Sequence, residues 1–455
     1  MFKKIEVWIL YLTLLLSILF AIGFGVLVRQ ELVGSFKAGW VSKTALTLAE
    51  IPVNIKTILN GRSGDLVVED RFPNIDSFNG TPNSEESYLL LSKYDGDLGE
   101  GVVELVDLRS FEILHTWNPD IDAFNDLVEQ VDEFKYLNRD KNNERSRIKH
   151  PKLLQDGHLL FHDVTPLRKI DDCSNLVFQN THDLFHHSTE TDIDGNIWVQ
   201  THIYPQSLTA KKVGKDLHIL DGGYWDDGVA KLSPDGEILF EKSVSQIFID
   251  YGLEYLLFAH GNDYEYDPIH LNDVQPVNFD GDFWKKGDLF LSVRNQSMIL
   301  LYRPSTNEII WKGTGPFLHQ HDVDIIDNHR ISIFNNRSIN VIGDTRIVDG
   351  HNEVIIYDFK TNDYSYYLKD SLIENDVRTI TEGRSEIHTN GDLFIEETNY
   401  GRTLYFNSDG SLRWTHVNRA DDGNVYRVGW SRILYTNEDI ETVNNFLTNK
   451  GTCDE

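Results

Sequence analysis

The sequence predicts an all-β protein, a six-bladed β-propeller, preceded by an N-terminal transmembrane helix. Three observations lead to this prediction: an uncharged apolar run near the N-terminus, short alternating apolar runs after residue 85, and one hairpin pattern that recurs six times. Asp-Gly and Asn-Gly turns separate the later runs, and no long stretch of helical periodicity interrupts them. We expect a transmembrane signal-anchor over 1–30, a juxtamembrane helix and linker over 31–84, and the propeller over 85–455.

The N-terminal apolar run extends from Val7 to Val28 without a charged residue. At about 1.5 Å per helical residue it is long enough to cross a bilayer core of about 30 Å. A cleaved signal peptide is the alternative, but the run exceeds the usual length and no small-x-small cleavage site follows it. Because Lys3 and Lys4 precede the run, the positive-inside rule places the N-terminus in the cytoplasm and the propeller outside, in the periplasm if the source is bacterial.

One hairpin pattern recurs at intervals of roughly 50 to 70 residues, the range of propeller repeats that carry loop insertions. Its copies read VDLRSFEILHTW, TPLRKIDDCSNLVFQ, AKLSPDGEILFEK, LYRPSTNEIIWKG, IYDFKTNDYSYYL and LYFNSDGSLRWTH. A second hairpin precedes most copies, as in HPKLLQDGHLLFHD and HSTETDIDGNIWVQT. Two hairpins make a four-stranded unit, and six such sheets arranged radially leave only short edges unpaired. A pair of β-sandwiches has a similar strand count but does not need six copies of one hairpin.

The charge balance excludes one class of partner. The chain has 42 Lys and Arg against 72 Asp and Glu, for a net charge of -30. Nucleic-acid binding needs a basic face, so we expect no nucleic-acid partner, and an anionic substrate would need its own local positive group. Cys173 and Cys453 are too few for a disulfide framework, although an extracytoplasmic location would permit one bond between them.

Histidines occupy one register at the start of the leading hairpins. Three of them stand seven or eight positions before the turn residue: His150 before Gly157, His187 before Gly195, and His321 before Asn328. His270 precedes a longer insertion that ends at Gly287. The first strand of each propeller blade is the innermost, so residues just before it gather at one mouth of the central channel. A single such histidine is usually a loop residue or a satisfied polar core group, but the shared register predicts a common site.

Arg294, in GDLFLSVRNQS, should lie one strand beyond His270 in the same blade. An arginine that enters a β-rich interior needs a carboxylate or an anionic ligand, because leaving it unpaired costs on the order of 3 to 5 kcal/mol. Asp267 or Asp273 could supply a salt bridge. The alternative is a guanidinium directed at an oxyanion of a substrate.

These stretches resemble the arylsulfotransferase family, enzymes that move sulfuryl groups between phenols without a nucleotide donor. The resemblance lies in HHSTETDIDGNIWV, YDPIHLNDVQPV, GDLFLSVRNQSMILLYRPSTNEIIWKG and FLHQHDVDIIDNHRISIFNNR, in that order. It implies that His321 is the nucleophile that becomes a sulfohistidine, and that His270 and Arg294 hold the sulfuryl oxygens. It also implies that His187 is the remaining active-site histidine. The neighbouring His186 fits the spacing to the turn less well, and His319 is not included.

The resemblance implies transfer of a sulfuryl group from an aryl sulfate to a phenolic acceptor, independent of the nucleotide donor PAPS and of any cofactor. The expected partners are a small phenolic donor and acceptor, together with the membrane through the N-terminal helix. The chemistry is consistent with the residue types. A neutral imidazole is a competent nucleophile, fixed positive donors stabilise charge on the peripheral oxygens, and a second histidine can act as general acid and base.

Two other functions fit the same residues. His187, His270 and His321, with Asp267 or Asp322, have the ligand types for zinc or another divalent ion, which would indicate a propeller hydrolase or lyase. An arginine in the same place disfavours a cation. The second alternative is a non-catalytic, membrane-tethered binding module, because propellers host many functions.

Overall fold

The computed structural model describes residues 6–33, 38–59, 66–207, 224–259, 266–341 and 345–453. The chain divides into two units, 1–65 and 66–455. The first unit contains helix α1 (Val7–Val33) and helix α2 (Trp40–Leu59). Residues 7–30 of α1 are long and apolar enough to cross a membrane, as a membrane anchor or a signal sequence would be. Lys3 and Lys4, on which the predicted orientation rests, lie outside the described residues.

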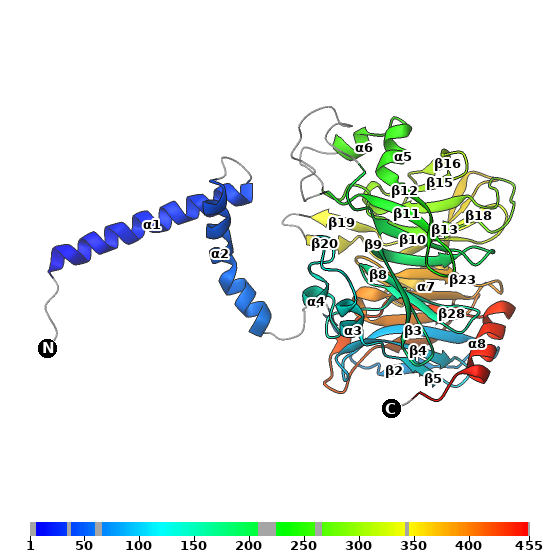
Figure 1. Cartoon of the computed structure of the whole chain (residues 1–455). Helices are drawn as coiled ribbons and strands as arrows, with labels where there is room; N and C mark the ends of the chain where they lie inside the picture. Colours follow the sequence, from blue (N-terminus) through cyan, green and yellow to red (C-terminus); the bar gives the residue numbers. More distant parts are fainter. Residues whose placement is uncertain are drawn as a thin grey trace. The chain divides into compact units, whose positions relative to one another are not determined.

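The second unit is an all-β, propeller-like fold of antiparallel sheets (Figure 1). The seven-stranded sheet contains β6 (Lys149–Leu153), β7 (Leu159–His162), β8 (Thr165–Ile170), β9 (Leu176–Thr191), β10 (Ile197–His202), β11 (Asp227–Leu232) and β12 (Ile238–Ser243). Two four-stranded sheets follow, with β13 (Leu271–Pro276), β14 (Leu289–Val293), β15 (Met298–Arg303) and β16 (Glu308–Gly313), then β17 (His321–Ile325), β18 (Arg330–Asn335), β21 (Glu353–Asp358) and β22 (Asp363–Tyr367).

The remaining sheets bring the two ends of this unit together. A five-stranded sheet holds β2 (Ser77–Gly80), β26 (Leu412–Val417), β25 (Arg402–Phe406), β24 (Leu393–Glu397) and β23 (Arg384–Ile387), and a four-stranded sheet holds β28 (Arg432–Leu434), β3 (Tyr88–Asp95), β4 (Glu100–Asp107) and β5 (Glu112–Trp117). Two-stranded ribbons pair β1 (Val67–Val68) with β27 (Val425–Tyr426) and β19 (Ser338–Val341) with β20 (Thr345–Val348). C-terminal strands therefore pair with strands that precede residue 96, so the array closes, and the segment before residue 85 contributes β1 and β2 to it.

Short helices connect or cover these sheets. They are α3 (Ile121–Asp126), α4 (Leu137–Asp140), α5 (Val244–Asp250), α6 (Tyr255–Phe258), α7 (Lys369–Glu374), α8 (Asn437–Asn449) and the 3₁₀ turns η2 (Arg294–Gln296) and η3 (Thr398–Tyr400). A capping box begins α8, in which Thr436 and Asp439 satisfy each other's backbone N–H groups.

The hydrogen bonds between strands do not form the expected six separate four-stranded sheets. In the described residues, five sheets have four strands or more, because the 16-residue strand β9 joins two strand groups into one sheet. Its first part pairs with β8 and its last part with β10, and Phe185 pairs with both neighbours. A propeller-like arrangement is shown, while the count of six blades stays a prediction.

The recurring hairpins are confirmed in all six positions, as β4–β5, β8–β9, β11–β12, β15–β16, β21–β22 and β25–β26. The leading hairpins β6–β7, β9–β10, β17–β18 and β23–β24 are also present. Gly157 and Gly195 occupy two of the turns with φ of 83° and 78°, values that other residues rarely adopt. The residues at these turns therefore determine where the chain reverses direction in each hairpin.

Three aspartates join a strand of one sheet to the first strand of the next sheet. Asp227 of β11 accepts the Leu271 backbone N–H at 2.6 Å, and Asp273 of β13 accepts that of Val323 at 2.7 Å. Asp322 of β17 continues the series by accepting the N–H of Ser385 at 2.8 Å. Since strands of neighbouring sheets do not share a ladder, these side chains satisfy backbone donors that would otherwise be buried without partners. Apolar residues fill the space between adjacent sheets, as where Phe290 and Leu301 pack with Ile331.

Cys173 and Cys453 form a disulfide, with their Cα atoms 5.3 Å apart. The bond ties the segment after α8 to the turn between β8 and β9. Helix α8 buries Val443 and Phe446 in a cluster with Trp117 of β5. The C-terminal segment is therefore held by both packing and a covalent bond.

Replacing both cysteines by alanine is expected to lower the free energy of unfolding by about 2 to 5 kcal/mol, because the bond constrains the unfolded chain. Urea unfolding of the oxidised protein and the double variant measures the difference. Adding a reductant to the double variant should change nothing. Equal midpoints for the oxidised protein and the variant would contradict a stabilising role for the bond.

Candidate active site

The structure brings the four predicted site residues together. His187 lies in β9, His270 directly precedes β13, His321 begins β17, and Arg294 follows β14 in η2. The ring centroid of His187 lies 5.1 Å from that of His270 and 6.3 Å from that of His321. The backbone N–H of Arg294 donates to the carbonyl of His270 at 3.1 Å. Three separate sheets thus contribute to one cluster.

The backbone of this cluster is in the left-handed region at several points. His187 has φ of 61° and His270 of 48°, and Trp430, whose ring lies beside both His187 and His321, has φ of 64°. A left-handed backbone is unfavourable for residues with bulky side chains and costs about 1 to 3 kcal/mol at each position. Such conformations gather at functional sites, which fits a role for these residues beyond packing.

His321 is buried and its hydrogen bonds define its tautomer. Its Nδ1 lies 2.7 Å from Oδ1 of Asn336, and the backbone N–H of Glu382 donates to its Nε2 at 3.2 Å. The Asn336 amide nitrogen donates to the carbonyls of Thr379 and Glu382, so its oxygen must be the acceptor that faces His321. His321 therefore carries its proton on Nδ1, and its Nε2 lone pair accepts the Glu382 N–H.

Burial and the nearby charge of Arg294 hold the pKa of His321 well below the usual range for histidine. Its imidazole is thus neutral, and hence nucleophilic, at neutral pH and in mild acid. The sequence indicates Asn336 only as part of an Asn-Arg-Ser sequon and gives no sign that it orients His321. Its position directly after strand β18 is the one available signal.

Arg294 is almost completely buried, with 1% of its surface exposed. Its Nη1 donates to Oδ1 of Asn295 at 2.7 Å, while Nε and Nη2 have no hydrogen-bond partner in the described part of the chain. No carboxylate among the described residues forms an ion pair with it, so neither Asp267 nor Asp273 supplies the salt bridge considered above. Burial lowers the pKa of Arg294 to about 10, which leaves it charged at neutral pH.

Asp267 pairs instead with His270. Its carboxylate lies 2.5 Å from Nδ1 of His270 and also accepts the His270 backbone N–H at 3.1 Å. Nε2, at the opposite edge of the ring, has no hydrogen bond to the described residues, and the side chain is 25% exposed, so a ligand can reach it. A carboxylate that orients one ring nitrogen is the arrangement used by acid–base histidines.

His187 contacts a second histidine that sequence spacing set aside. Its Nδ1 lies 2.7 Å from Nδ1 of the adjacent His186, so one of the two rings donates and the other accepts. Burial, and next the charge of Lys149, hold the pKa of His187 well below its usual range. His319, which was excluded from the predicted site, hydrogen-bonds through Nδ1 to the carbonyl of Ser338.

Basic side chains surround the loop that meets His321. Lys149 pairs with the Glu382 carboxylate at 2.5 Å, and Arg147 and Arg427 lie 3.2 and 3.4 Å from the same carboxylate. Glu382 is also the residue whose backbone N–H reaches His321. Asp163 also lies 3.8 Å from Arg147, and with Arg294 the four cations still outnumber the nearby carboxylates of Glu382, Asp163 and Asp267. The sequence alone did not indicate this cluster.

The sequence profile described as Arylsulfotransferase (ASST) matches residues 150–419, more than half of the chain. The chain belongs to the arylsulfotransferase family. The matched region contains all four predicted site residues: His187, His270, Arg294 and His321. Family membership supports a sulfotransferase-like enzyme.

A comparison with curated proteins gives no match. Among solved structures, a protein of unknown function from Bacteroides caccae is similar at 10% identity and a TM-score of 0.46, covering 76% of this chain and 98% of that one. A streptogramin B lyase has 10% identity and a TM-score of 0.35, covering 78% and 96%. Virginiamycin B lyase from Staphylococcus aureus has 10% identity and a TM-score of 0.34, covering 74% and 86%. The family assignment rests on the sequence profile.

Potential metal-binding groups lie beside this cluster. In the part of the chain that the structure describes, two sets of histidine and carboxylate atoms approach within 4.8 Å of one another: His186, His202 and Asp227, and His182, Asp183 and Glu241. Neither set contains His187, His270 or His321, the ligands that the alternative metal hypothesis uses.

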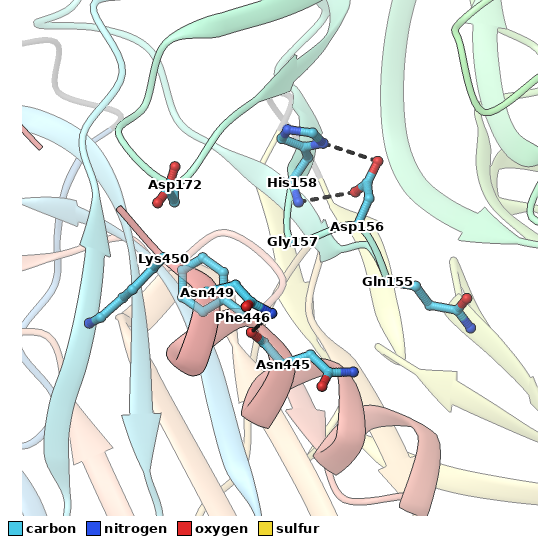
Figure 2. Close-up of a pocket in the computed structure, with 9 residues that line it drawn as sticks. All are labelled: Gln155, Asp156, Gly157, His158, Asp172, Asn445, Phe446, Asn449 and Lys450. Carbon is cyan, nitrogen blue, oxygen red and sulfur yellow. Dashed lines mark hydrogen bonds and ion pairs between the residues drawn. The ribbon is translucent and has the colours of Figure 1, made fainter. Parts of the chain in front are cut away.

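A surface pocket lies elsewhere, between the β6–β7 turn and α8 (Figure 2). Its lining includes His158, which pairs with Asp156 at 3.0 Å, and the ring of Phe446. None of the predicted site residues lines it. We therefore place the chemistry at the histidine cluster, and His158 serves below as a control.

Buried aspartates lie along the inner strands beside the cluster. Burial, and next the neighbouring Asp322 carboxylate, raise the pKa of Asp273 above its usual range. Its folded pKa then exceeds its unfolded pKa, so the stability that this carboxyl contributes is present in acid and is lost as pH rises through the folded value.

Replacing Asp273 by asparagine is therefore expected to remove part of the pH dependence of folding. Above about pH 4, the free energy of unfolding of the wild type should fall relative to Asp273→Asn, by at most about 1.4 kcal/mol per pH unit. Urea unfolding of both proteins between about pH 5 and about pH 8 measures this. Parallel pH profiles would show that Asp273 is ionised throughout that range.

Proposed function

We propose that this protein transfers a sulfuryl group from an aryl sulfate to a phenolic acceptor, through a sulfohistidine at His321 and without PAPS. The observation that carries the proposal is a neutral, oriented imidazole near the buried guanidinium of Arg294, whose Nε and Nη2 have no hydrogen-bond partner among the described residues. A sulfate ester supplies the oxygens that such donors bind. The reaction itself requires no cofactor.

In the first half-reaction, the hydrogen bond from the Glu382 N–H to Nε2 of His321 breaks, and the Nε2 lone pair attacks sulfur. The N–S bond forms as the bond from sulfur to the aryl oxygen breaks, and the electron pair leaves on the phenolate. Arg294 stabilises charge on the peripheral sulfuryl oxygens, as fixed donors do in phosphoryl transfer. Asn336 accepts the Nδ1–H without being able to remove the proton, so the sulfohistidine keeps a positively charged ring and stays a good leaving group.

Proton transfer completes each half-reaction. His270, oriented by Asp267, would protonate the departing phenolate and then take the proton from the incoming phenol as it attacks sulfur. His187 lies next to both His270 and His321, where it can contact the sulfuryl group or the phenol. The cycle returns His321 to its neutral tautomer, so protons and electron pairs balance.

The location belongs to the same proposal. Helix α1 would act as an uncleaved anchor with the N-terminus in the cytoplasm and the β unit outside, in the periplasm if the source is bacterial. The disulfide supports an oxidising compartment. Outside the cytosol, an aryl sulfate is a more accessible donor than an activated nucleotide. We also infer six blades, with β9 counted once in each of two adjacent blades.

Intact-protein mass spectrometry after brief exposure to 4-nitrophenyl sulfate tests the mechanism. The wild type should gain one sulfuryl group and release an equivalent of 4-nitrophenol. His321→Asn should gain none, whereas His158→Asn, altered in the pocket of Figure 2, should behave as the wild type. An unmodified wild-type protein with a range of aryl sulfates would favour a non-catalytic binding module. Equal modification of His321→Asn would place the covalent step on another residue.

A further inference from the structure

Three side chains on adjacent strands form a cluster behind His187. His186 in β9, His202 at the end of β10 and Asp227 at the start of β11 come together because these strands are neighbours in the seven-stranded sheet. Oδ1 of Asp227 lies 3.4 Å from Nε2 of His186 and 3.2 Å from Nε2 of His202. The two imidazole ring centroids are 4.1 Å apart. Three potential metal ligands therefore face one point.

Two of the facing atoms are buried and have no hydrogen-bond partner. Nε2 of His186 and Oδ1 of Asp227 have none among the described residues, although both side chains are at most 2% exposed. The other oxygen of Asp227 accepts the N–H of Leu271, so that carboxylate is fixed in place. Buried polar atoms without partners are rare in folded proteins, and each needs an explanation such as an ordered water or a bound ion.

An ordinary ion pair explains these contacts less well. Two imidazolium rings whose centroids lie 4.1 Å apart would repel each other, so both histidines cannot pair with Asp227 as cations. By contrast, ligand atoms at about 2.0 to 2.1 Å from a tetrahedral zinc ion lie about 3.3 to 3.4 Å from one another, close to the observed separations.

We propose that Nε2 of His186, Nε2 of His202 and Oδ1 of Asp227 bind a divalent transition-metal ion, with zinc as the ion that their chemistry and spacing suit best. Two imidazoles and one carboxylate are a common zinc ligand set, and water would complete the tetrahedron. This site is distinct from the sulfuryl site and does not depend on the proposed function.

The metal site would fix the protonation state of the neighbouring His187. A metal on Nε2 of His186 leaves the proton of that ring on Nδ1, which then donates to Nδ1 of His187 at 2.7 Å. The proton of His187 must in turn be on its Nε2. His186 is then a positioning residue that sets the donor presented by His187, as outer hydrogen bonds of metal ligands often do.

The second set of metal-ligand types provides a matched control. Nε2 of His182 lies 3.5 Å from Glu241 and 3.9 Å from Asp183, but the His182 side chain is 51% exposed. His182 is also in β9, four residues before His186, so His182→Gln and His202→Gln are comparable substitutions on neighbouring strands. Only the second removes a ligand of the proposed site.

Isothermal titration of Zn²⁺ into the full-length, chelator-treated protein in detergent tests this proposal. The wild type and His182→Gln should bind about one Zn²⁺ per chain, and His202→Gln should bind at least about 100-fold more weakly. Co²⁺ should give tetrahedral ligand-field absorption in the wild type and lose it in His202→Gln. No Zn²⁺ binding by the wild type, unchanged affinity in His202→Gln, or loss of binding in His182→Gln would each overturn the proposal. Sulfohistidine formation is measured separately, so failure of either proposal leaves the other testable.

Discussion

Replacing His321 by asparagine is expected to lower kcat for sulfuryl transfer by about 1,000-fold or more, because it removes the nucleophile on which both half-reactions depend. Initial rates with 4-nitrophenyl sulfate and a phenolic acceptor measure the loss. His158→Asn should retain wild-type rates. Thermal unfolding should separate lost chemistry from lost structure, since the hydrogen bonds of His321 to Asn336 and Glu382 also contribute to packing.

A rescue experiment distinguishes a nucleophile from a structural histidine. In His321→Gly, free imidazole can enter the vacated space and accept the sulfuryl group, so adding imidazole should restore release of 4-nitrophenol. The product should then include sulfoimidazole. Because a hydrogen-bonding role cannot generate that product, full activity of His321→Asn, or a rescued rate without sulfoimidazole, would contradict the proposed mechanism.

The sequence predicted the hairpins and the histidine cluster because both depend on short-range patterns. Asp-Gly turns and alternating apolar residues fix each hairpin within about 15 residues. The shared spacing of His187 and His321 to their turns then placed residues from different sheets at the same end of their strands. In a radial arrangement, a common register alone brings such residues together.

These short-range patterns do not predict contacts between sheets. Asn336 and the Glu382 N–H orient His321 from segments 15 and 61 residues away, and nothing in their local sequence indicates that partner. The sharing of β9 between two strand groups was also missed, because its length depends on which strands pack on either side. The spacing to the turn argued against His186 as a site residue. A bulge between Val199 and Gln200 changes the pairing register next to His186, so spacing along the sequence does not fix its position.

The salt bridge considered for Arg294 was the other point that sequence could not decide. Asp267 and Asp273 were expected near it in the same blade, but the first orients His270 and the second accepts the Val323 N–H. The guanidinium is thus left with buried donors and without a carboxylate partner in the described structure. A structural role and a ligand-binding role of Arg294 therefore predict different effects of its substitution on stability and activity.

Replacing Arg294 by methionine is expected to lower kcat/KM by about 100- to 1,000-fold while leaving the protein equally stable or more stable by about 1 to 3 kcal/mol. A buried charge without a partner opposes folding, so its removal relieves a cost, whereas the transition state loses the donors that hold its sulfuryl oxygens. Steady-state kinetics and urea unfolding of the same preparations measure the two effects.

Two further measurements identify the ligand of Arg294. Arg294→Lys should recover only part of the rate, because an ammonium keeps the charge but cannot present the planar fork of donors. Inorganic sulfate should raise the melting temperature of the wild type and not that of Arg294→Met, since an anion that binds only the folded state stabilises it by mass action. A destabilised Arg294→Met that keeps its activity would show the opposite: an arginine that supports the fold and has no part in binding the sulfuryl group.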